Sequence, residues 1–206
     1  MTALCLAFAA LWPVLRTDAH PMPESLVWLD VHADGIQVEL RLPVDALAKG
    51  FGRALRPNVR QRTAQLRDSL SAYIADHIAL SGVEGKLWHA QVQHIDVVTE
   101  DGADEVWATV WFAAPDGIVP AMLTMQYDLI IHELRTHKAL VAIRTDEARG
   151  INASDPQYVG RLTWHTDRIV IDRTERIPPI AAWVPLGAVG FVFLVGVAVV
   201  LSVRRR

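Results

Sequence analysis

The sequence SLVWLDVHADGIQVELRL (residues 25–42) alternates apolar and polar side chains on both sides of a turn-forming segment, Ala33-Asp34-Gly35. A period of two residues is typical of β-strands with one face on a core, and Asp-Gly is a strong turn signal. The apolar positions that share a face are Val27, Leu29 and Val31 before the turn and Val38, Leu40 and Leu42 after it. The stretch therefore predicts a β-hairpin, which ends at Pro43.

Further strand patterns, separated by turn residues, follow this hairpin. They cover residues 86–99, 105–113, 123–131, 138–145 and 159–173, the last with a break near Asp167. Residues 45–51 can form a short helical turn. From Asn58 onward, apolar residues recur at spacings of three and four, which predicts an amphipathic helix across a sheet; they are Leu66, Leu70, Tyr73, Ile74 and Ile78. We expect a mainly β fold, an antiparallel β-sandwich-like extracytoplasmic domain with one inserted α-helix.

Both ends of the chain are apolar. Residues 180–203 contain no charged side chain and precede Arg204, Arg205 and Arg206. As a helix this run extends about 36 Å, which is enough to cross a hydrocarbon core of about 30 Å. Residues 1–19 have the apolar core and the small terminal residues of a signal peptide, although no basic residue precedes that apolar core. Cys5 is the one cysteine of the sequence and lies in this leader, so we expect no thiol chemistry in the mature protein.

These ends predict the domain organisation and the location. We expect a signal peptide over residues 1–19, an extracytoplasmic β-rich domain over residues 20–176, and a C-terminal transmembrane helix with a short arginine tail over residues 177–206. The arginines favour a cytoplasmic C-terminus in a single-pass protein of the cytoplasmic (inner) membrane, with the lipid bilayer as a partner. A sorting tail that is removed after export is an alternative interpretation of the same pattern.

The net charge and the motifs disfavour some classes of function. Residues 20–179 hold 16 of the 20 Lys and Arg residues and 22 of the 23 Asp and Glu residues, a net charge of −6 with neutral histidines. Nucleic acid is therefore not an expected partner. No complete catalytic motif appears, so we do not expect an enzyme. Five tryptophans in strand patterns can line a carbohydrate or peptide groove, but a place in the core is favoured; they are Trp28, Trp88, Trp107, Trp111 and Trp164.

Histidine is the residue type that points to chemistry. Cleavage after Ala19 leaves His20 at the N-terminus, where its amine and imidazole together can chelate Cu²⁺ or Ni²⁺. His132 and His137 flank a short predicted connection, so both rings can converge on such a site. The alternative is structural: His132 caps a strand end and His137 bonds a turn carbonyl. His77 falls near the apolar face of the predicted helix and is expected to be a hydrogen-bonded core histidine.

Several segments carry a family resemblance. These are AHPMP (residues 19–23), VWLDVH (27–32) leading into LRLP (40–43), and YDLIIH (127–132) leading into THKALV (136–141). They are similar to the extracytoplasmic N-terminal region of HupE/UreJ-type membrane proteins. The resemblance implies an exported domain of the same fold, in a family associated with hydrogenase and urease accessory roles and with nickel, cobalt or related metals. The sequence lacks that family's multi-helix membrane module, so permease activity is not carried over.

Two hypotheses of function follow. The first is a membrane-anchored, non-enzymatic domain that binds a Ni, Cu or Co ion or assists a metal transporter, with His20, His132 and His137 as candidate ligands. The second is a structural or interaction module that docks on another envelope protein. The first predicts that His132 and His137 lie near the mature N-terminus. The second predicts an exposed apolar or aromatic patch without converging histidines.

Overall fold

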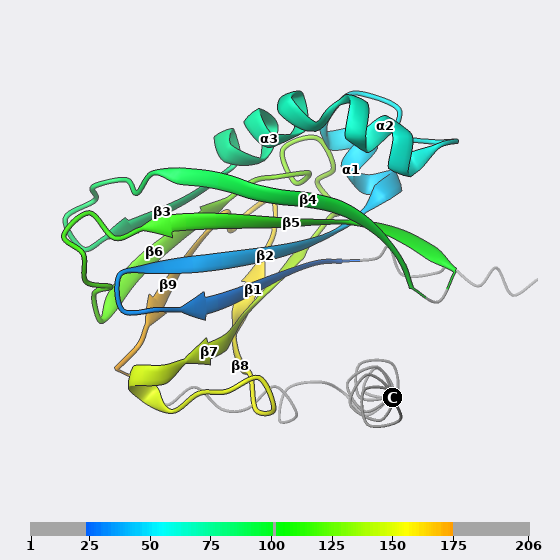
Figure 1. Ribbon diagram of the computed structural model, residues 1–206. Coiled ribbons are helices and arrows are strands. Elements are labelled where there is room, and N and C mark those ends of the chain that lie inside the picture. Colours follow the sequence, from blue (N-terminus) through cyan, green and yellow to red (C-terminus); the bar gives the residue numbers. More distant parts are fainter. Residues whose placement is uncertain (1–23, 101, 175–206) are drawn as a thin grey trace, which may run out of the picture.

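The β-hairpin over residues 25–42 lies at the centre of a six-stranded sheet (Figure 1). The computed structural model describes residues 24–100 and 102–174, and within these ranges nine strands form two sheets. The strands are β1 (Ser25–Val31), β2 (Gly35–Pro43), β3 (Ile78–Gly82), β4 (Ala90–Glu100), β5 (Ala103–Ala113), β6 (Met122–Tyr127), β7 (Ala139–Asp146), β8 (Gln157–Leu162) and β9 (Arg168–Asp172). The prediction of a mainly β fold is confirmed.

The order of strands is β4-β5-β2-β1-β7-β8 in sheet A and β3-β6-β9 in sheet B. The hairpin has the predicted register, with Val27 opposite Leu40 and Leu29 opposite Val38. Its turn is closed by a hydrogen bond of 2.9 Å from the His32 N–H to the Gly35 carbonyl. A Cβ at Gly35 would lie 2.4 Å from the Trp111 ring and 2.6 Å from the Phe112 backbone oxygen, so the space at this position requires glycine.

Sheet A is mixed, which corrects the expectation of a purely antiparallel fold. Strands β1 and β7 pair in parallel, with Val27 opposite Val141, and the register shifts between Leu29 and Asp30. A parallel pair needs a long crossover connection, and here the connection contains all the elements between β1 and β7. The alternation of apolar residues in β1 and β7 is the same whether the two strands pair in parallel or antiparallel. The sequence pattern therefore does not predict the direction of pairing.

The helical region also differs from the prediction. Besides α1 (Val44–Gly50), the expected single helix is two, α2 (Val59–Gln65) and α3 (Arg67–Asp76), which meet at Leu66. A 3-10 turn, η1 (Glu147–Arg149), follows β7. Ile78, expected on the helix, instead begins β3, where it pairs with Tyr127. Its spacing from Ile74 fits a helix and its spacing from Leu80 fits a strand, and the pairing with β6 decides between them.

The two sheets share one core. Inward side chains of sheet A, such as Leu29, Val38 and Leu40, are fully buried, as are Leu80 and Met125 of sheet B, and all belong to a single apolar cluster. The helices lie above this sandwich in Figure 1, where α2 and α3 contact β4. Burial of apolar surface on both inner faces is the main stabilising contribution to such a fold.

The tryptophans do not share the predicted location. Trp88 is buried in the core, as expected. Trp28, Trp107 and Trp111 are partly exposed on the outer face of sheet A, and Trp164 is exposed in the β8–β9 turn, which corrects the expectation that they fill the core. Each of the three sheet tryptophans stands between two buried residues, so the alternation that predicts the strands also directs their side chains outward.

The strands define two ends of the sandwich. At one end, here called the histidine end, β1 and β7 begin, β6 finishes, and α3 leads into β3. The other end is here called the exit end. It contains the last residues of β3 and β9, the first residues of β6, and the turn between β1 and β2. The described chain leaves at the exit end with Thr174.

Among the described residues, no helix combines the length and the apolar character needed to cross a bilayer. The predicted leader (residues 1–19), His20 and the predicted span (residues 180–203) lie outside the described residues.

Candidate functional site

A group of four polar and aromatic side chains lies at the histidine end, where the C-terminus of α3 meets the connection between β6 and β7. Tyr73 comes from α3, His77 follows that helix, and Asp128 and His132 follow β6. The pairing of Ile78 with Tyr127 places His77 beside Asp128, and the Asp128 N–H donates to the His77 carbonyl at 3.1 Å. The two sides of the group are therefore positioned by sheet B.

The β6–β7 connection folds tightly to bring His132 to the same place. The His132 N–H donates to the Asp128 carbonyl at 2.9 Å, and the Leu134 N–H donates to the Ile130 carbonyl at 2.9 Å. Ile130 has a φ of 68°, a conformation that costs energy for a β-branched residue. Its N–H is held by the Tyr73 hydroxyl oxygen at 3.0 Å. The strained turn is thus supported from α3.

The two histidine rings stack on each other. Their centroids are 4.2 Å apart and their planes differ by 11°. His77 Nδ1 lies 2.8 Å from Asp128 Oδ1, and His132 Nδ1 lies 3.0 Å from the Asp128 backbone oxygen. A carbonyl oxygen and an ionised carboxylate only accept hydrogen bonds, so both Nδ1 atoms are donors. In the neutral rings the lone pair is then on Nε2 in both cases.

Tyr73 completes the group. Its ring centroid is 4.6 Å from that of His77 and 5.9 Å from that of His132. Burial raises the pKa of Tyr73 to about 12, so its hydroxyl stays neutral near neutral pH. A Cβ on Gly50 of α1 would lie 2.7 Å from the Tyr73 hydroxyl and 2.8 Å from Ile130 Cα. The close approach of α1 therefore requires glycine at this position.

Solvent reaches the group. The side chain of His77 is 24% exposed and that of Asp128 is 37% exposed. Among residues 24–100 and 102–174, no cluster of three or more His, Cys, Asp or Glu side chains has an arrangement that holds a metal ion. What the group offers is a pair of imidazole nitrogens with their second nitrogens already hydrogen-bonded. Further ligands would have to come from outside the pair.

The predicted ligands His132 and His137 have different neighbours. His137 is 1% exposed, and its Nε2 lies 2.8 Å from the Ser25 hydroxyl at the start of β1. No described residue bonds its Nδ1. Burial lowers the pKa of His137 to about 4, so the ring is neutral at neutral pH. The structure brings His132 to His77 and places His137 in the interior beside Ser25. The third predicted ligand, His20, lies outside the described residues.

His77 was not among the sequence-predicted ligands. It was expected as a core histidine of a continuous helix, whereas it caps α3 and is only half-buried. The signal that was available is the alternation of Ile78, Ala79 and Leu80, which indicates that the helix ends before Ile78. The stacking with His132 itself has no signal in the sequence, because it depends on the pairing of β3 with β6.

The outer face of sheet A is a second candidate surface. Arg144 of β7 donates to both carboxylate oxygens of Asp30 and, at 2.9 Å, to Glu39. The Arg41 guanidinium lies 3.9 Å from the centre of the Trp107 ring. Burial acts to raise the pKa of Asp30, but hydrogen bonds from Arg144 and Thr145 hold it below its ordinary value. The charges on this face are therefore largely satisfied by one another.

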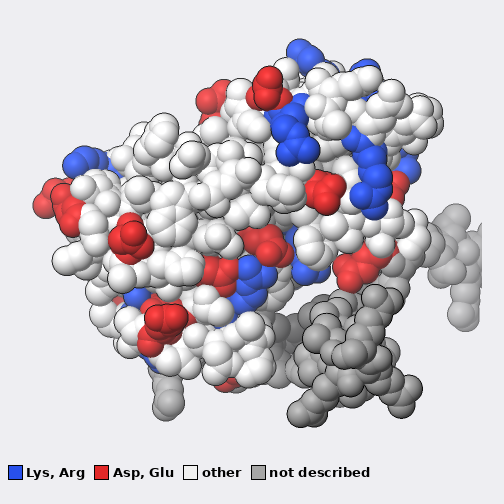
Figure 2. Space-filling model, viewed as in Figure 1, with Lys and Arg blue, Asp and Glu red and all other residues white. Residues whose placement is uncertain are grey.

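Sheet A lies in front of sheet B in Figure 1, so Figure 2, drawn from the same side, shows this outer face. Uncharged side chains cover most of it, and acidic and basic side chains lie next to one another near its centre. The partly exposed tryptophans belong to this surface. It combines aromatic area with neutralised charge.

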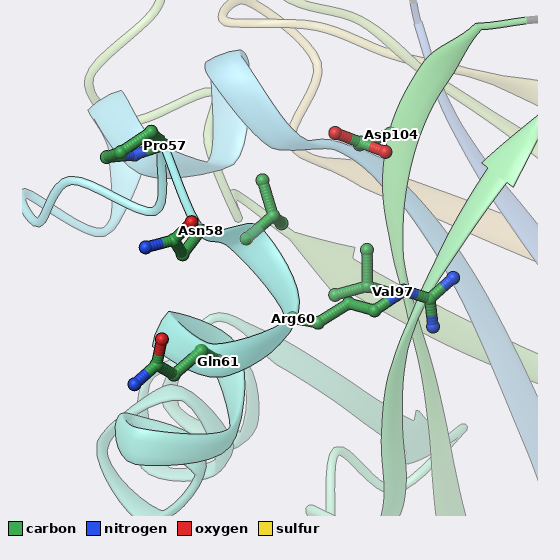
Figure 3. A pocket seen from close by; sticks show the side chains of 7 residues that line it. Pro57, Asn58, Arg60, Gln61, Val97 and Asp104 are labelled. Atoms are coloured by element: carbon green, nitrogen blue, oxygen red, sulfur yellow. The ribbon is translucent and has the colours of Figure 1, made fainter.

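A pocket of about 400 Å³ lies between α2 and the ends of β4 and β5 (Figure 3). It is open to solvent and lined by Pro57, Asn58, Val59, Arg60, Gln61, Val97 and Asp104. Its charged members, Arg60 and Asp104, have opposite signs, and Asp104 already accepts hydrogen bonds from Arg56 and Thr99. The charges that line the pocket therefore do not indicate a charged ligand.

Comparison of the sequence with family models and with curated proteins gives no match.

Proposed function

We propose that this protein is a membrane-anchored extracytoplasmic domain that binds a transition-metal ion, Ni²⁺, Cu²⁺ or Co²⁺, through His77 and His132. One observation carries the proposal: both Nδ1 atoms of the stacked pair are hydrogen-bonded to Asp128, one to its carboxylate and one to its backbone carbonyl. Histidines that bind metals characteristically donate the second ring N–H to a carboxylate or a carbonyl, which fixes the tautomer and aims the free nitrogen.

The two histidine side chains are suitable ligands for these ions. Neutral imidazole nitrogen is a preferred ligand of copper and nickel. The two rings supply two ligands, and the remaining coordination positions stay available to water or to a donor from another molecule. Such an open coordination sphere favours transfer of the ion to a partner, such as a metal transporter of the same membrane, over permanent storage.

His20 remains a candidate for a further ligand. Ser25, the first residue of β1, lies at the histidine end, where it bonds His137. His20 precedes Ser25 by five residues, a length of chain that reaches at most about 18 Å. A free amine and imidazole at residue 20 are therefore within range of the histidine end. The proposal for His77 and His132 does not depend on this contribution.

The test is a calorimetric titration of Cu²⁺ and Ni²⁺ into the full-length chain, produced by export and purified in detergent. We expect His77→Gln and His132→Gln each to weaken binding strongly, because each removes one of two imidazole ligands. Asp128→Ala should weaken binding about 10- to 100-fold, since it removes the carboxylate that orients His77. The matched control is His94→Gln, because His94 is exposed on β4 and has no role in the group.

A variant with one additional residue before His20 tests the N-terminal ligand separately. Loss of binding in this variant alone would assign the site to the terminal amine. Binding that is unchanged in both His77→Gln and His132→Gln would overturn the proposal for the stacked pair.

A second candidate function is docking on another envelope protein. The observation that favours it is the outer face of sheet A, where Trp28, Trp107 and Trp111 are partly exposed beside mutually paired charges. Aromatic residues and arginine are enriched at protein interfaces. A photo-crosslinking residue in place of Trp28, in cells that make the full-length protein, tests it. A discrete crosslinked partner that is absent with the same residue at position 72 on α3 would support docking through sheet A.

A further inference from the structure

We propose that the exit end of the sandwich rests on the membrane surface, with the loops between β3 and β4 and between β5 and β6 in the interfacial region of the lipid. The inference rests on the membrane anchoring in the proposed function and adds which face of the domain meets the bilayer. It comes from where the exposed apolar side chains of the domain are gathered.

Four of the six exposed large apolar side chains among the described residues lie at this end. Val83 is 79% exposed and Leu87 68% exposed in the β3–β4 loop, and Ile118 is 74% exposed in the β5–β6 loop. Met122, 43% exposed, is the first residue of β6. Side chains of this kind at the tips of neighbouring loops are typical of a surface that meets another apolar phase.

Contacts on sheet B hold these loops together. Gly82 pairs with Leu123, so the next residue, Val83, emerges beside Met122. Leu87 forms a bridge with Ser81, which keeps it near the end of β3. The β5–β6 loop is fixed in turn to the hairpin of sheet A, because the Val119 N–H donates to the Ala33 carbonyl at 3.2 Å. In Figure 1 the two loops lie next to each other on the left.

The chain leaves the described domain from the same place. Met122 pairs with Asp172, and the Arg173 N–H donates to the Ala121 carbonyl at 2.8 Å. The Arg173 guanidinium donates to the carbonyls of Val119 and Pro120 at 3.0 Å and forms an ion pair of 2.8 Å with the buried Asp146. The exit of the chain is thus fixed against the loop that carries Ile118.

The distance to the predicted span is short. Five residues separate Thr174 from Ile180, the first residue of the uncharged run, and these six steps extend at most about 22 Å. A span that begins there holds the exit end close to the lipid. The occupant that fits the exposed apolar side chains is therefore the bilayer. Glu84 and Lys86 lie between Val83 and Leu87 and have opposite charges, which suits the polar headgroup region.

The experiment uses the full-length chain with Cys5→Ser and single cysteines, L87C or I118C, each labelled with an environment-sensitive fluorophore. The matched control is A72C, because Ala72 is a small exposed residue on α3 away from the exit end. The protein is incorporated at one copy per nanodisc of phosphatidylcholine and phosphatidylglycerol, with or without a lipid that carries a nitroxide on its headgroup. Urea unfolding of each variant verifies that it is folded.

We expect the nitroxide lipid to quench the probes at positions 87 and 118 severalfold more than the probe at position 72. Equal quenching at all three positions in protein that is incorporated would overturn the inference and leave the anchoring intact. Protein that does not incorporate into nanodiscs would overturn the anchoring and this inference together. The same measurement is repeated in nanodiscs loaded with two copies. A probe response that appears only in these two-copy discs would identify a second copy as the occupant and also overturn the inference.

Discussion

The histidine end and the exit end of the same sandwich are built in opposite ways. At the histidine end, polar and aromatic side chains contact one another, as in the stacked rings of His77 and His132, and the exposed large apolar side chain there is Trp164. At the exit end, the polar side chains Arg173 and Asp146 are buried, while apolar ones such as Ile118 are exposed. This difference underlies both proposals, a metal site at the histidine end and contact with the bilayer at the exit end.

The largest effect is expected at the exit end, in the Arg173–Asp146 pair. Arg173→Met keeps the apolar stem but leaves the Asp146 carboxylate, 1% exposed, without its cation. Removal of one partner of a buried ion pair lowers the free energy of unfolding by about 3–5 kcal/mol. Urea unfolding measures this loss. Arg56→Met removes two ion pairs, with Asp45 and Asp104, of an arginine side chain that is 49% exposed, and it should cost about 1 kcal/mol. Equal losses would show that Arg173 does not fix the exit of the chain.

The next largest effect is expected in the pH dependence of the free energy of unfolding, through His137 at the histidine end. Burial lowers the pKa of His137 to about 4 from an ordinary value of 6.5, so between these values the unfolded chain binds a proton that the folded protein does not. Stability should therefore be fully present above pH 6.5 and fall by about 3 kcal/mol as the pH drops to 4. Urea midpoints across this range measure the loss.

His137→Gln separates this contribution from those of the other titrating groups. The variant should lose most of the slope of stability against pH between 6.5 and 4 while its affinity for Cu²⁺ at neutral pH stays unchanged. A loss of Cu²⁺ affinity would instead place His137 among the ligands. An unchanged slope would show that its ring is not held neutral by burial.

A smaller loss of stability is expected when a glycine is replaced by alanine, and the loss should differ between the two ends. Gly50→Ala at the histidine end places a Cβ 2.8 Å from Ile130 Cα, and overpacking of this kind costs about 1–3 kcal/mol. Gly82→Ala at the exit end has its nearest contact at 3.8 Å, from Pro120, and should change stability by less than about 0.5 kcal/mol. Thermal unfolding of both variants decides the comparison. If Gly82→Ala were the more damaging, the exit end would be the tighter packed of the two.

The smallest effect is expected for the exposed apolar side chains of the exit end. Leu87→Ser and Ile118→Ser should change the free energy of unfolding in detergent by less than about 0.5 kcal/mol, because both side chains are mostly exposed. Leu29→Ser, in the core, is the contrasting variant and should be severely destabilising. A large loss for either loop variant would mean that these side chains stabilise the domain itself.

Local patterns predicted much of the sheet. The alternation in residues 25–42 identified β1 and β2 with their register, since a one-residue slip would move Val27 and Leu29 out of the core. The same alternation also directs Trp28 outward, in contrast to the expectation that the tryptophans fill the core. The end of α3 was misplaced because Ile78 fits both helical and strand spacing.

The candidate site was predicted only in part. His132 was identified from its place in a short connection between strands, and the structure adds His77 and Asp128 as its neighbours. His77 and His132 are far apart in the sequence, and their contact requires the antiparallel pairing of Ile78 with Tyr127. A contact between residues so far apart cannot be predicted from their spacing in the sequence.

The sequence by itself determined the elements whose cause is local. Periodic apolar residues define the strands, and Ala33-Asp34-Gly35 forms the hairpin turn. The tertiary structure alone decided the parallel pairing of β1 with β7, the stacking of His77 on His132, and the gathering of Leu87 and Ile118 at the exit of the chain. These features join segments distant in sequence, and they form only because both sheets bury a shared core.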